Sequence, residues 1–552
     1  MKKFTLIILS IVVYSTIMGQ TAPDKYWVQF TDKNDSPFSI DNPIEFLSQK
    51  SIDRRNAQNI EITEQDLPVN QDYIDQVLAI GNISLLLKSK WFNSITIYTT
   101  DPGLIDLIEQ LSIVSQVKSV EKYKKGIYED EEIPAFQKEF DPLDYGTSYD
   151  QLEELNGEAL HENDFLGEDM LIFVCDGGFT NLDIVDAFNH LFDDNRIIGT
   201  HDFVDGDDFV YQGSSHGTSV MGTMAGIIPN ELKGTAPSAS YFLARTENTA
   251  SEYEIEEDNW ISAAELADSL GADVITTSLS YTTFDDTTQD HSYEDLDGQT
   301  TRIAIGAGIA AQKGMLIVVS AGNYYQQEWH YIGSPADAID ILAIGAITSD
   351  SLHSSFSSAG PSADGRVKPD IVARGTAAAT ANTGNNGVSY VNGTSFSGPI
   401  IAGISACLWQ AYPSATSLQI REAIIQSAHQ YSDPDDLMGY GIPNYGNAMV
   451  YLENTLGIPP MQKLSSSIIQ RVYPNPFIDN VSIELRAPNG GYDEGTITLY
   501  NASGVRVYKS NLILEGKSVV KVNISTINLA SGVYYFEYEG MSEKETIKLV
   551  HL

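Results

Sequence analysis

The segment LIFVCDGGF, residues 171–179, has the pattern of a buried strand that ends on a carboxylate and two glycines. An unbroken apolar run is typical of a strand covered on both faces, as in a parallel sheet flanked by helices. Binding and catalytic sites of open α/β sheets lie beyond the carboxyl ends of the strands. The segment therefore predicts a parallel sheet with Asp176 at its functional edge.

The sequence after this strand alternates between strand-like and helical patterns. Further apolar, strand-like runs lie between alanine-rich stretches with a helical pattern, as the crossovers of a parallel sheet require. The runs are residues 274–278 and 316–320, and the helical stretches are residues 260–270, 303–312 and 399–412. We predict a doubly wound α/β domain over residues 145–456.

Three further segments of this domain carry candidate chemistry. SSHGTSVMGTMAG contains His216, VVSAGNYY contains Asn323, and NGTSFSGP contains Ser395 just before Pro399, where we expect a helix to start. Alone, each has an ordinary explanation: a structural histidine, a turn asparagine and a helix-capping serine. Together they supply what amide hydrolysis through a serine needs, namely a nucleophile, a base, a carboxylate that orients the base and an oxyanion donor.

These segments resemble the subtilisin-like serine peptidases, whose catalytic groups follow the order Asp, His, Ser, with the oxyanion asparagine before the serine. The resemblance extends to four other motifs: GTAPSAS at 234–240, SLS at 278–280, FSSAGP at 356–361 and KPDIVARG at 368–375. It implies that Ser395 is the nucleophile, His216 the general base and Asp176 the group that orients it. Asn323 and the Ser395 N–H would form the oxyanion hole.

The resemblance also implies a substrate-binding edge at Ser278, Leu279, Ser280 and Gly322, which would pair with an extended peptide. We expect Tyr324, Trp329 and Tyr331 to narrow the adjoining pocket. Two residues depart from the family pattern: Gly177 stands where a serine or threonine usually follows the aspartate, and Arg374 where a proline is usual. We expect Gly177 to cost a hydrogen bond to Asp176.

The chain before this domain divides into three parts. Residues 1–20 have the lysines and short apolar run of a signal peptide, with an N-terminal membrane anchor as the alternative. Residues 21–125 mix strand and helix patterns and occupy the position of the family's inhibitory propeptides; a retained binding domain is the alternative. Residues 126–144 form an acidic linker.

The chain after the domain changes to short alternating strands. Following a linker at 457–470, residues 471–552 predict an all-β sandwich. YPNPF at 473–477, LASGVYYFEY at 529–538 and the final KLVHL resemble the sorting domains of the type IX secretion route of Bacteroidetes. That resemblance implies the outer-membrane secretion machinery as a partner. A carbohydrate-binding or adhesive sandwich is the alternative.

The composition limits the partners. A net charge of −43 makes nucleic acid an unfavourable partner, and no span after the signal is long enough to cross a bilayer. Cys175 and Cys407 lie in apolar segments, which favours two buried free thiols over one bridge. No cofactor is needed for the chemistry. A structural calcium at Asp202, Asp205, Asp207 and Asp208 competes with a simple solvated loop.

These observations predict a secreted serine endopeptidase, extracellular or attached to the outer cell surface, that is made as an inactive precursor and cleaves proteins or peptides. Two other classes stay open: a catalytically weak or dead relative that binds peptides, and a surface adhesin that uses the domain as a scaffold. The complete set of catalytic residue types favours the enzyme, because neither alternative needs a nucleophile, a base and an oxyanion donor together.

Overall fold

The computed structural model describes residues 25–121, 145–458, 460 and most of 468–551, with short gaps in the last range. Those gaps are residues 474, 476, 478–479, 488–491, 516–518, 526–528 and 542–543. The expected signal peptide and acidic linker lie outside the described residues. Within the described residues, no helix combines the length and apolar character needed to cross a membrane.

The N-terminal domain is an antiparallel sheet with helices. Its strands lie in the order β2-β3-β1-β4, with bounds β1 Lys25–Phe30, β2 Ser84–Ser89, β3 Ser94–Tyr98 and β4 Val114–Glu121. The helices are α1 Gln49–Gln58, α2 Gln71–Leu78 and α3 Gly103–Glu109. Buried Val28, Ile74 and Ile97 form part of its core. This is the predicted small α+β unit.

The central domain contains a seven-stranded parallel sheet in the order β13-β12-β11-β10-β5-β9-β6. The strands are β5 Leu171–Asp176, β6 Ile197–Asp202, β9 Ser240–Arg245, β10 Val274–Thr277, β11 Leu316–Ser320, β12 Leu342–Ile347 and β13 Ile371–Arg374. The predicted α/β class is confirmed.

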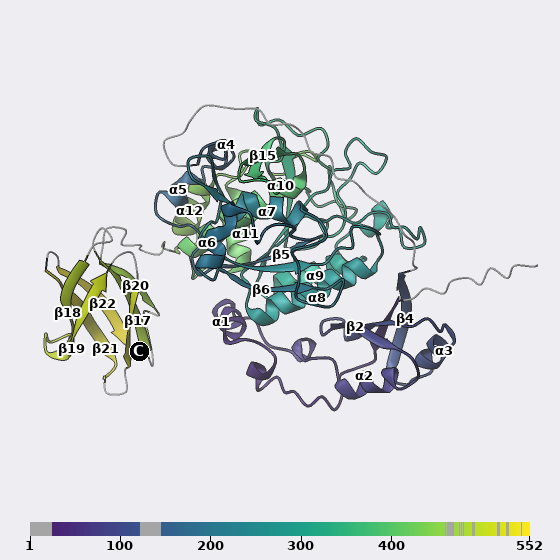
Figure 1. Ribbon diagram of the computed structural model, residues 1–552, viewed down its shortest axis with the longest axis horizontal. Coiled ribbons are helices and arrows are strands. Elements are labelled where there is room, and N and C mark those ends of the chain that lie inside the picture. Colours follow the sequence, from purple (N-terminus) through teal and green to yellow (C-terminus); the bar gives the residue numbers. More distant parts are fainter. Residues whose placement is uncertain are drawn as a thin grey trace, which may run out of the picture.

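Helices cover both faces of this sheet. Successive strand residues point to opposite sides, so Ile172 and Val174 of β5 pack with one core cluster and Phe173 and Cys175 with the other. The first face holds α7 His216–Ala225 and α10 Thr394–Ala411. The second holds α8 Ile255–Leu270 and α9 Arg302–Gln312, below which the N-terminal domain lies in Figure 1. Burial on both faces explains the continuous apolar strands.

Shorter elements complete the central domain. The helices are α4 Tyr149–Glu153, α5 Glu158–His161, α6 Asn189–Asp193, α11 Ser417–Gln426 and α12 Tyr445–Asn454. The strand pairs are β7 Ile227–Ile228 with β8 Leu232–Lys233, and β14 Ala378–Ala381 with β15 Val388–Val391. The described part of this domain has 3₁₀ helices at Asp186–Phe188 and Tyr293–Asp295, and the N-terminal domain has them at Pro43–Glu45 and Glu64–Asp66. Cys175 and Cys407 are buried and form no disulfide bond, as predicted.

The start of α10 corrects one prediction. The helix begins at Thr394 and contains Pro399, rather than starting there. Proline has no N–H to donate to the carbonyl four residues earlier, which is that of Ser395. The hydroxyl of Ser278 donates to this carbonyl instead, at 2.8 Å. Ser395 therefore lies inside the first turn of α10. The hydroxyl of Ser278, the residue after β10, replaces the backbone hydrogen bond that Pro399 cannot make.

The C-terminal domain has two antiparallel sheets, ordered β16-β17-β20 and β19-β18-β21-β22. Their strands are β16 Ile469–Tyr473, β17 Asn480–Arg486, β18 Tyr492–Asn501, β19 Arg506–Glu515, β20 Val519–Ser525, β21 Gly532–Glu539 and β22 Lys544–His551. Side chains from both sheets, such as Ile483, Leu499 and Phe536, share one buried cluster. This domain is all-β, as predicted.

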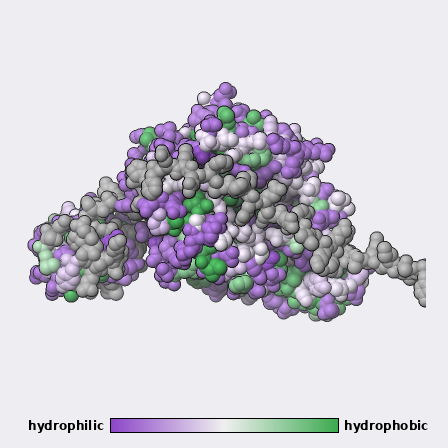
Figure 2. Space-filling view, turned by 45° about the horizontal axis from the view of Figure 1, so that its top comes forward, coloured by the Kyte–Doolittle hydropathy of each residue, from purple (hydrophilic) through white to green (hydrophobic). Residues whose placement is uncertain are grey.

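The molecular surface matches the strongly acidic composition. The face shown in Figure 2 is predominantly hydrophilic, with small and separate hydrophobic spots. Single exposed apolar residues of this kind are normal for a protein in water.

Candidate active site

Asp176 and His216 meet at the carboxyl edge of the sheet. Asp176 is the last residue of β5 and His216 the first of α7. The Nδ1 atom of His216 lies 3.0 Å from each carboxylate oxygen of Asp176. The aspartate side chain is 1% exposed and the histidine side chain 30% exposed. A buried carboxylate thus holds one ring nitrogen, while part of the imidazole side chain stays exposed.

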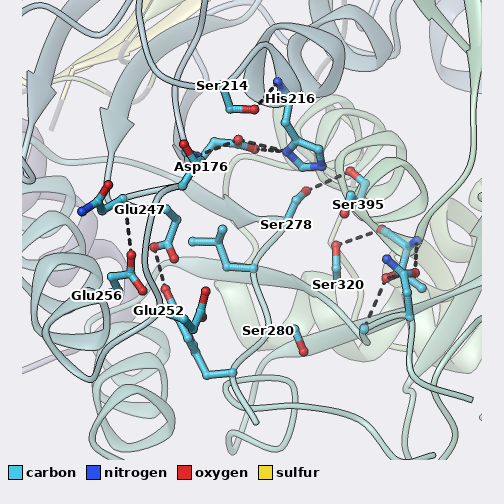
Figure 3. A pocket seen from close by; sticks show the side chains of 18 of the residues that line it. Asp176, Ser214, His216, Glu247, Glu252, Glu256, Ser278, Ser280, Ser320 and Ser395 are labelled. Carbon is cyan, nitrogen blue, oxygen red and sulfur yellow. Dashed lines mark hydrogen bonds and ion pairs between the residues drawn. The ribbon is translucent and has the colours of Figure 1, made fainter. Parts of the chain in front are cut away.

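Ser395 approaches the same place from the first turn of α10. Gly393, the residue before the helix, has φ 145°, a conformation that favours glycine. The ring of Phe396, the next residue after Ser395, packs 5.6 Å from that of His216. Asp176, His216 and Ser395 line one cavity of about 320 Å³, and Figure 3 shows their side chains gathered around it. The structure therefore brings the three predicted catalytic residues together.

Asn323 follows β11 and lines this cavity. Its Oδ1 accepts hydrogen bonds from the backbone N–H of Thr394 at 2.9 Å and from the Thr394 hydroxyl at 3.1 Å. Because both donors hold the oxygen, the Nδ2 amide is the group left to donate elsewhere. Thr394 precedes Ser395 directly, so these bonds tie the asparagine to the turn that carries the nucleophile candidate.

The predicted substrate-binding residues Ser278, Leu279, Ser280 and Gly322 all line the cavity. Tyr324 lines it as well, and its hydroxyl donates to the Ser280 carbonyl at 2.8 Å. Trp329 and Tyr331 are not among the residues lining this cavity; the Trp329 indole N–H donates to Ile332 and the Tyr331 ring packs on Tyr293. Of the three aromatic residues expected to narrow the pocket, the structure places Tyr324 there.

The two departures from the family pattern have local explanations. The backbone N–H of Gly177 donates to Oδ1 of Asp176 at 2.7 Å, but glycine has no side-chain hydroxyl to add a second bond, so the expected loss stays a prediction. A Cβ at 177 would lie 2.9 Å from the Thr249 methyl group, which favours glycine here. Arg374 forms a salt bridge with Glu154 and joins the end of β13 to the end of α4.

The candidate calcium residues bind other protein groups. Asp202 and Asp205 both pair with Arg245 Nη1 at 2.7 Å, and Asp208 pairs with His201 at 2.8 Å. Asp207 accepts from the N–H of Phe209. Calcium needs roughly six to eight oxygens around one point, and these carboxylates do not provide such a set. The arrangement fits a loop closed by arginine.

Sequence reasoning missed three glutamates in the cavity wall. Glu247, Glu252 and Glu256 line the same cavity as Ser395, and their ligand oxygens lie within 4.8 Å of one another. The sequence feature that could have identified them is their close spacing directly after β9, at the carboxyl edge of the predicted sheet. Figure 3 shows the three glutamates together on the left of the cavity, below Asp176, with Ser395 on the right.

Three family models match consecutive parts of the chain. Residues 167–441 match the subtilase family, residues 25–132 a peptidase S8 propeptide domain of Bacteroidota, and residues 471–551 a secretion system C-terminal sorting domain. The central domain is a subtilase. The chain is thus of the subtilisin-like serine protease family, with a propeptide domain and a type IX sorting domain, and the latter implies secretion or attachment to the outer surface.

Curated relatives agree with this assignment. Subtilisin E of Bacillus subtilis is 27% identical over 59% of this chain and 77% of its own length. The thermostable alkaline protease of Halalkalibacterium halodurans is 25% identical over 63% of this chain and 86% of its own. A solved MycP1 structure from Mycobacterium smegmatis, at 20% identity and TM-score 0.43, covers 58% of this chain and 92% of that one. The sequence identity and TM-score of the MycP1 match are too low to support any further conclusion about the fold.

The propeptide domain of this subtilase is joined to α8 by buried charges. Asp268 pairs with Arg54 at 2.6 Å, Arg55 at 2.8 Å and Lys90 at 3.0 Å, and its side chain is fully buried. Burial alone would raise the pKa of Asp268, but the three cations outweigh it and hold the pKa at about 2. Glu265 accepts three hydrogen bonds from residues 89–91. The two domains thus share a buried ionic contact.

Proposed function

We propose that this subtilase is an endopeptidase that cleaves proteins outside the cell, and that it is made as a precursor held inactive by residues 25–121. The observation that carries the proposal is the pair of 3.0 Å contacts from Asp176 to Nδ1 of His216. They fix the tautomer in which Nδ1 carries the proton and Nε2 can accept one. Ser395 lines the same cavity and supplies the hydroxyl.

The acylation step uses these groups in sequence. Oγ of Ser395 attacks the scissile carbonyl carbon while its proton passes to Nε2 of His216. The oxyanion that forms accepts hydrogen bonds from Nδ2 of Asn323 and the backbone N–H of Ser395. The C–N bond then breaks, the leaving amine takes the proton from His216, and an acyl-enzyme ester remains on Ser395.

Deacylation repeats the sequence with water in place of the serine. His216 takes a proton from the water as its oxygen attacks the ester carbon, and the C–Oγ bond breaks. Ser395 recovers the proton from His216, and the carboxylic acid product leaves. Asp176 stabilises the imidazolium in both halves without becoming protonated.

The position of Ser395 also favours attack. The dipole of α10 and the N–H groups of its first turn favour negative charge beside the nucleophile. The hydroxyls of Ser320 and Ser278 donate to the carbonyls of Thr394 and Ser395, at 2.8 Å each. These two bonds hold the turn against the ends of β10 and β11.

The experiment is hydrolysis of an unfolded protein by the processed chain, beside Ser395→Ala and a control, Ser355→Ala, at an exposed serine of the same domain. We expect Ser395→Ala to lose cleavage and labelling by a sulfonyl fluoride, while Ser355→Ala keeps both. Equal cleavage by all three proteins would overturn the assignment of the nucleophile. No cleavage by the processed parent would favour a relative that only binds peptides.

A further inference from the structure

The carboxylates of Glu247, Glu252 and Glu256 form a second polar group in the catalytic cavity. Glu247 follows β9, Glu252 lies in the loop before α8, and Glu256 lies in the first turn of that helix. The proposed reaction uses none of them. We call these three residues the glutamate cluster.

Donors of the protein occupy only some of the carboxylate oxygens of this cluster. Both oxygens of Glu256 accept backbone N–H groups, from Asn248 at 2.8 Å and Tyr253 at 3.1 Å. Oε1 of Glu247 accepts from the hydroxyls of Tyr281 and Thr246, at 2.5 and 3.0 Å. In the described part of the chain, Oε2 of Glu247 and both oxygens of Glu252 accept no hydrogen bond. Glu247 is only 8% exposed and lines the cavity, so its Oε2 is an open acceptor on a largely buried side chain of the cavity wall.

No basic side chain balances the cluster within the described residues. Arg245, on the strand that precedes it, is occupied by Asp202 and Asp205. Burial raises the pKa of Glu247 well above its ordinary value, and repulsion from Glu252 adds to the shift. Burial and the carboxylates of Asp285 and Glu257 raise the pKa of Glu252 to about 7. The wall therefore favours any ligand that brings a positive charge.

We propose that the glutamate cluster is a specificity site that binds a lysine or arginine side chain of the substrate. This inference rests on the proposed function and names the class of substrate. Ser278, Leu279 and Ser280 line the same cavity as the cluster, so an extended peptide paired along this edge directs alternate side chains into it. The residue recognised lies apart from the scissile bond, because the cluster is on the opposite side of the cavity from Ser395 (Figure 3).

The free acceptors fit a basic side chain better than a metal ion. The open oxygens are the three on Glu247 and Glu252, since both oxygens of Glu256 are already bonded. A lysine ammonium offers three N–H donors and an arginine guanidinium five, whereas calcium requires roughly six to eight oxygens. Arginine can also bind a carboxylate through two parallel hydrogen bonds.

The precursor's own sequence contains a basic segment, whose positive charge is opposite to that of the glutamate cluster. Glu121, the last residue of β4, lines a second cavity that shares Asn248 and Glu256 with the catalytic cavity. The next residues in the sequence are Lys122, Tyr123, Lys124 and Lys125. In the sequence, a basic segment therefore follows directly after Glu121. A peptide with the sequence of residues 120–128 is a suitable probe.

The experiment compares this peptide with versions in which the lysines are replaced by glutamine, singly and together. Affinity is measured by fluorescence anisotropy in the processed Ser395→Ala protein, which needs no turnover, and kcat/KM is measured in the active parent. We expect the lysine peptide to be favoured about tenfold or more, the ratio that about 1.4 kcal/mol supplies. Glu252→Gln should bring this ratio close to unity. Glu162→Gln, at an exposed glutamate outside the cavity, should leave it unchanged.

Equal binding of the lysine and glutamine peptides would overturn the inference, as would a preference that Glu252→Gln leaves intact. A calcium-dependent rise in melting temperature that Glu252→Gln abolishes, without any lysine preference, would make the cluster a metal site and equally overturn it. A lysine preference in binding with no cleavage of any peptide by the parent would refute the proposed function alone. The inferred ligand class would then stand.

Discussion

Nδ1 of His216 is equidistant from the two carboxylate oxygens of Asp176, at 3.0 Å, while the backbone N–H of Gly177 donates to one of them at 2.7 Å. The aspartate can therefore act only as an acceptor toward the histidine. An amide in its place could donate to Nδ1 and favour the wrong tautomer. For Asp176→Asn we expect kcat to fall about 10⁴-fold with little change in KM, the size of effect known for such a change in a serine protease triad.

Steady-state kinetics on a peptide substrate would test this, with Asp183→Asn, at an exposed aspartate, as the matched control. A loss in Asp176→Asn no larger than in the control would show that the carboxylate does not orient the base.

Asn323 gives the second prediction. Thr394 holds its Oδ1 with two hydrogen bonds, so Asn323→Ala removes the Nδ2 donor from the cavity. We expect kcat to fall about 10²–10³-fold, or roughly 2.7–4 kcal/mol, a range carried over from a subtilisin asparagine rather than derived from this chain. Gln327→Ala, at an exposed neighbour, is the control. An increase in KM alone would assign Asn323 to ground-state binding.

The sequence was sufficient to predict that Asp176, His216, Asn323 and Ser395 would line one cavity, though not every residue of its wall. Asp176, Asn323 and Ser278 all follow apolar strand-like runs, and parallel strands place their carboxyl ends on one edge. The apolar runs identify the strands, and the motifs identify the residues at their ends. His216 and Ser395 begin helices, whose first turns lie at that same edge in a parallel sheet.

The errors have physical causes too. Proline is usual at the first position of a helix, which led to the wrong start at Pro399. The bond from Ser278 to the Ser395 carbonyl, which makes an internal proline acceptable, joins residues 117 apart in the sequence. The glutamate cluster was missed for a similar reason, since the cavity that it lines is completed by residues of other strands, such as Tyr281, whose hydroxyl donates to Glu247. Both the start of α10 and the glutamate cluster depend on contacts between segments that are distant in the sequence, which a local sequence pattern does not show.

The ionic contact between the propeptide domain and α8 gives a third prediction. Arg55 is fully buried and pairs with both Asp66 and Asp268. Arg55→Met removes a cation from each, and leaving buried carboxylates short of a partner costs about 3–5 kcal/mol. We expect a much lower yield of processed enzyme. If the propeptide is removed as proposed, the variant's mature enzyme has the parent sequence and the same activity per active site.

Active-site titration of secreted material would separate yield from activity. Lys88→Met, at an exposed lysine of the same domain, should give the parent yield. A parent-like yield from Arg55→Met would show that the contact contributes little to forming the enzyme. A lower activity per site would show instead that Arg55 stays in the mature protein.

The pH dependence of stability gives the last prediction. Burial and neighbouring carboxylates raise the pKa of Glu252 from 4.5 to about 7. Between these two values the folded chain binds more protons at this site than the unfolded chain, so the free energy of unfolding decreases as the pH rises. A shift of one pKa unit corresponds to about 1.4 kcal/mol, and with Glu252 partly exposed we expect a loss on the order of 1–3 kcal/mol by pH 8.

Glu252→Gln removes this titration. In a Ser395→Ala background, which prevents self-cleavage, its melting temperature should match the parent near pH 4 and exceed it by several degrees near pH 8. The variant should keep a residual slope, because burial also raises the pKa of Glu247 and Glu256. Glu162→Gln should follow the parent at every pH. Parallel curves for Glu252→Gln and the parent would show that folding does not raise the pKa of Glu252 and would contradict the prediction.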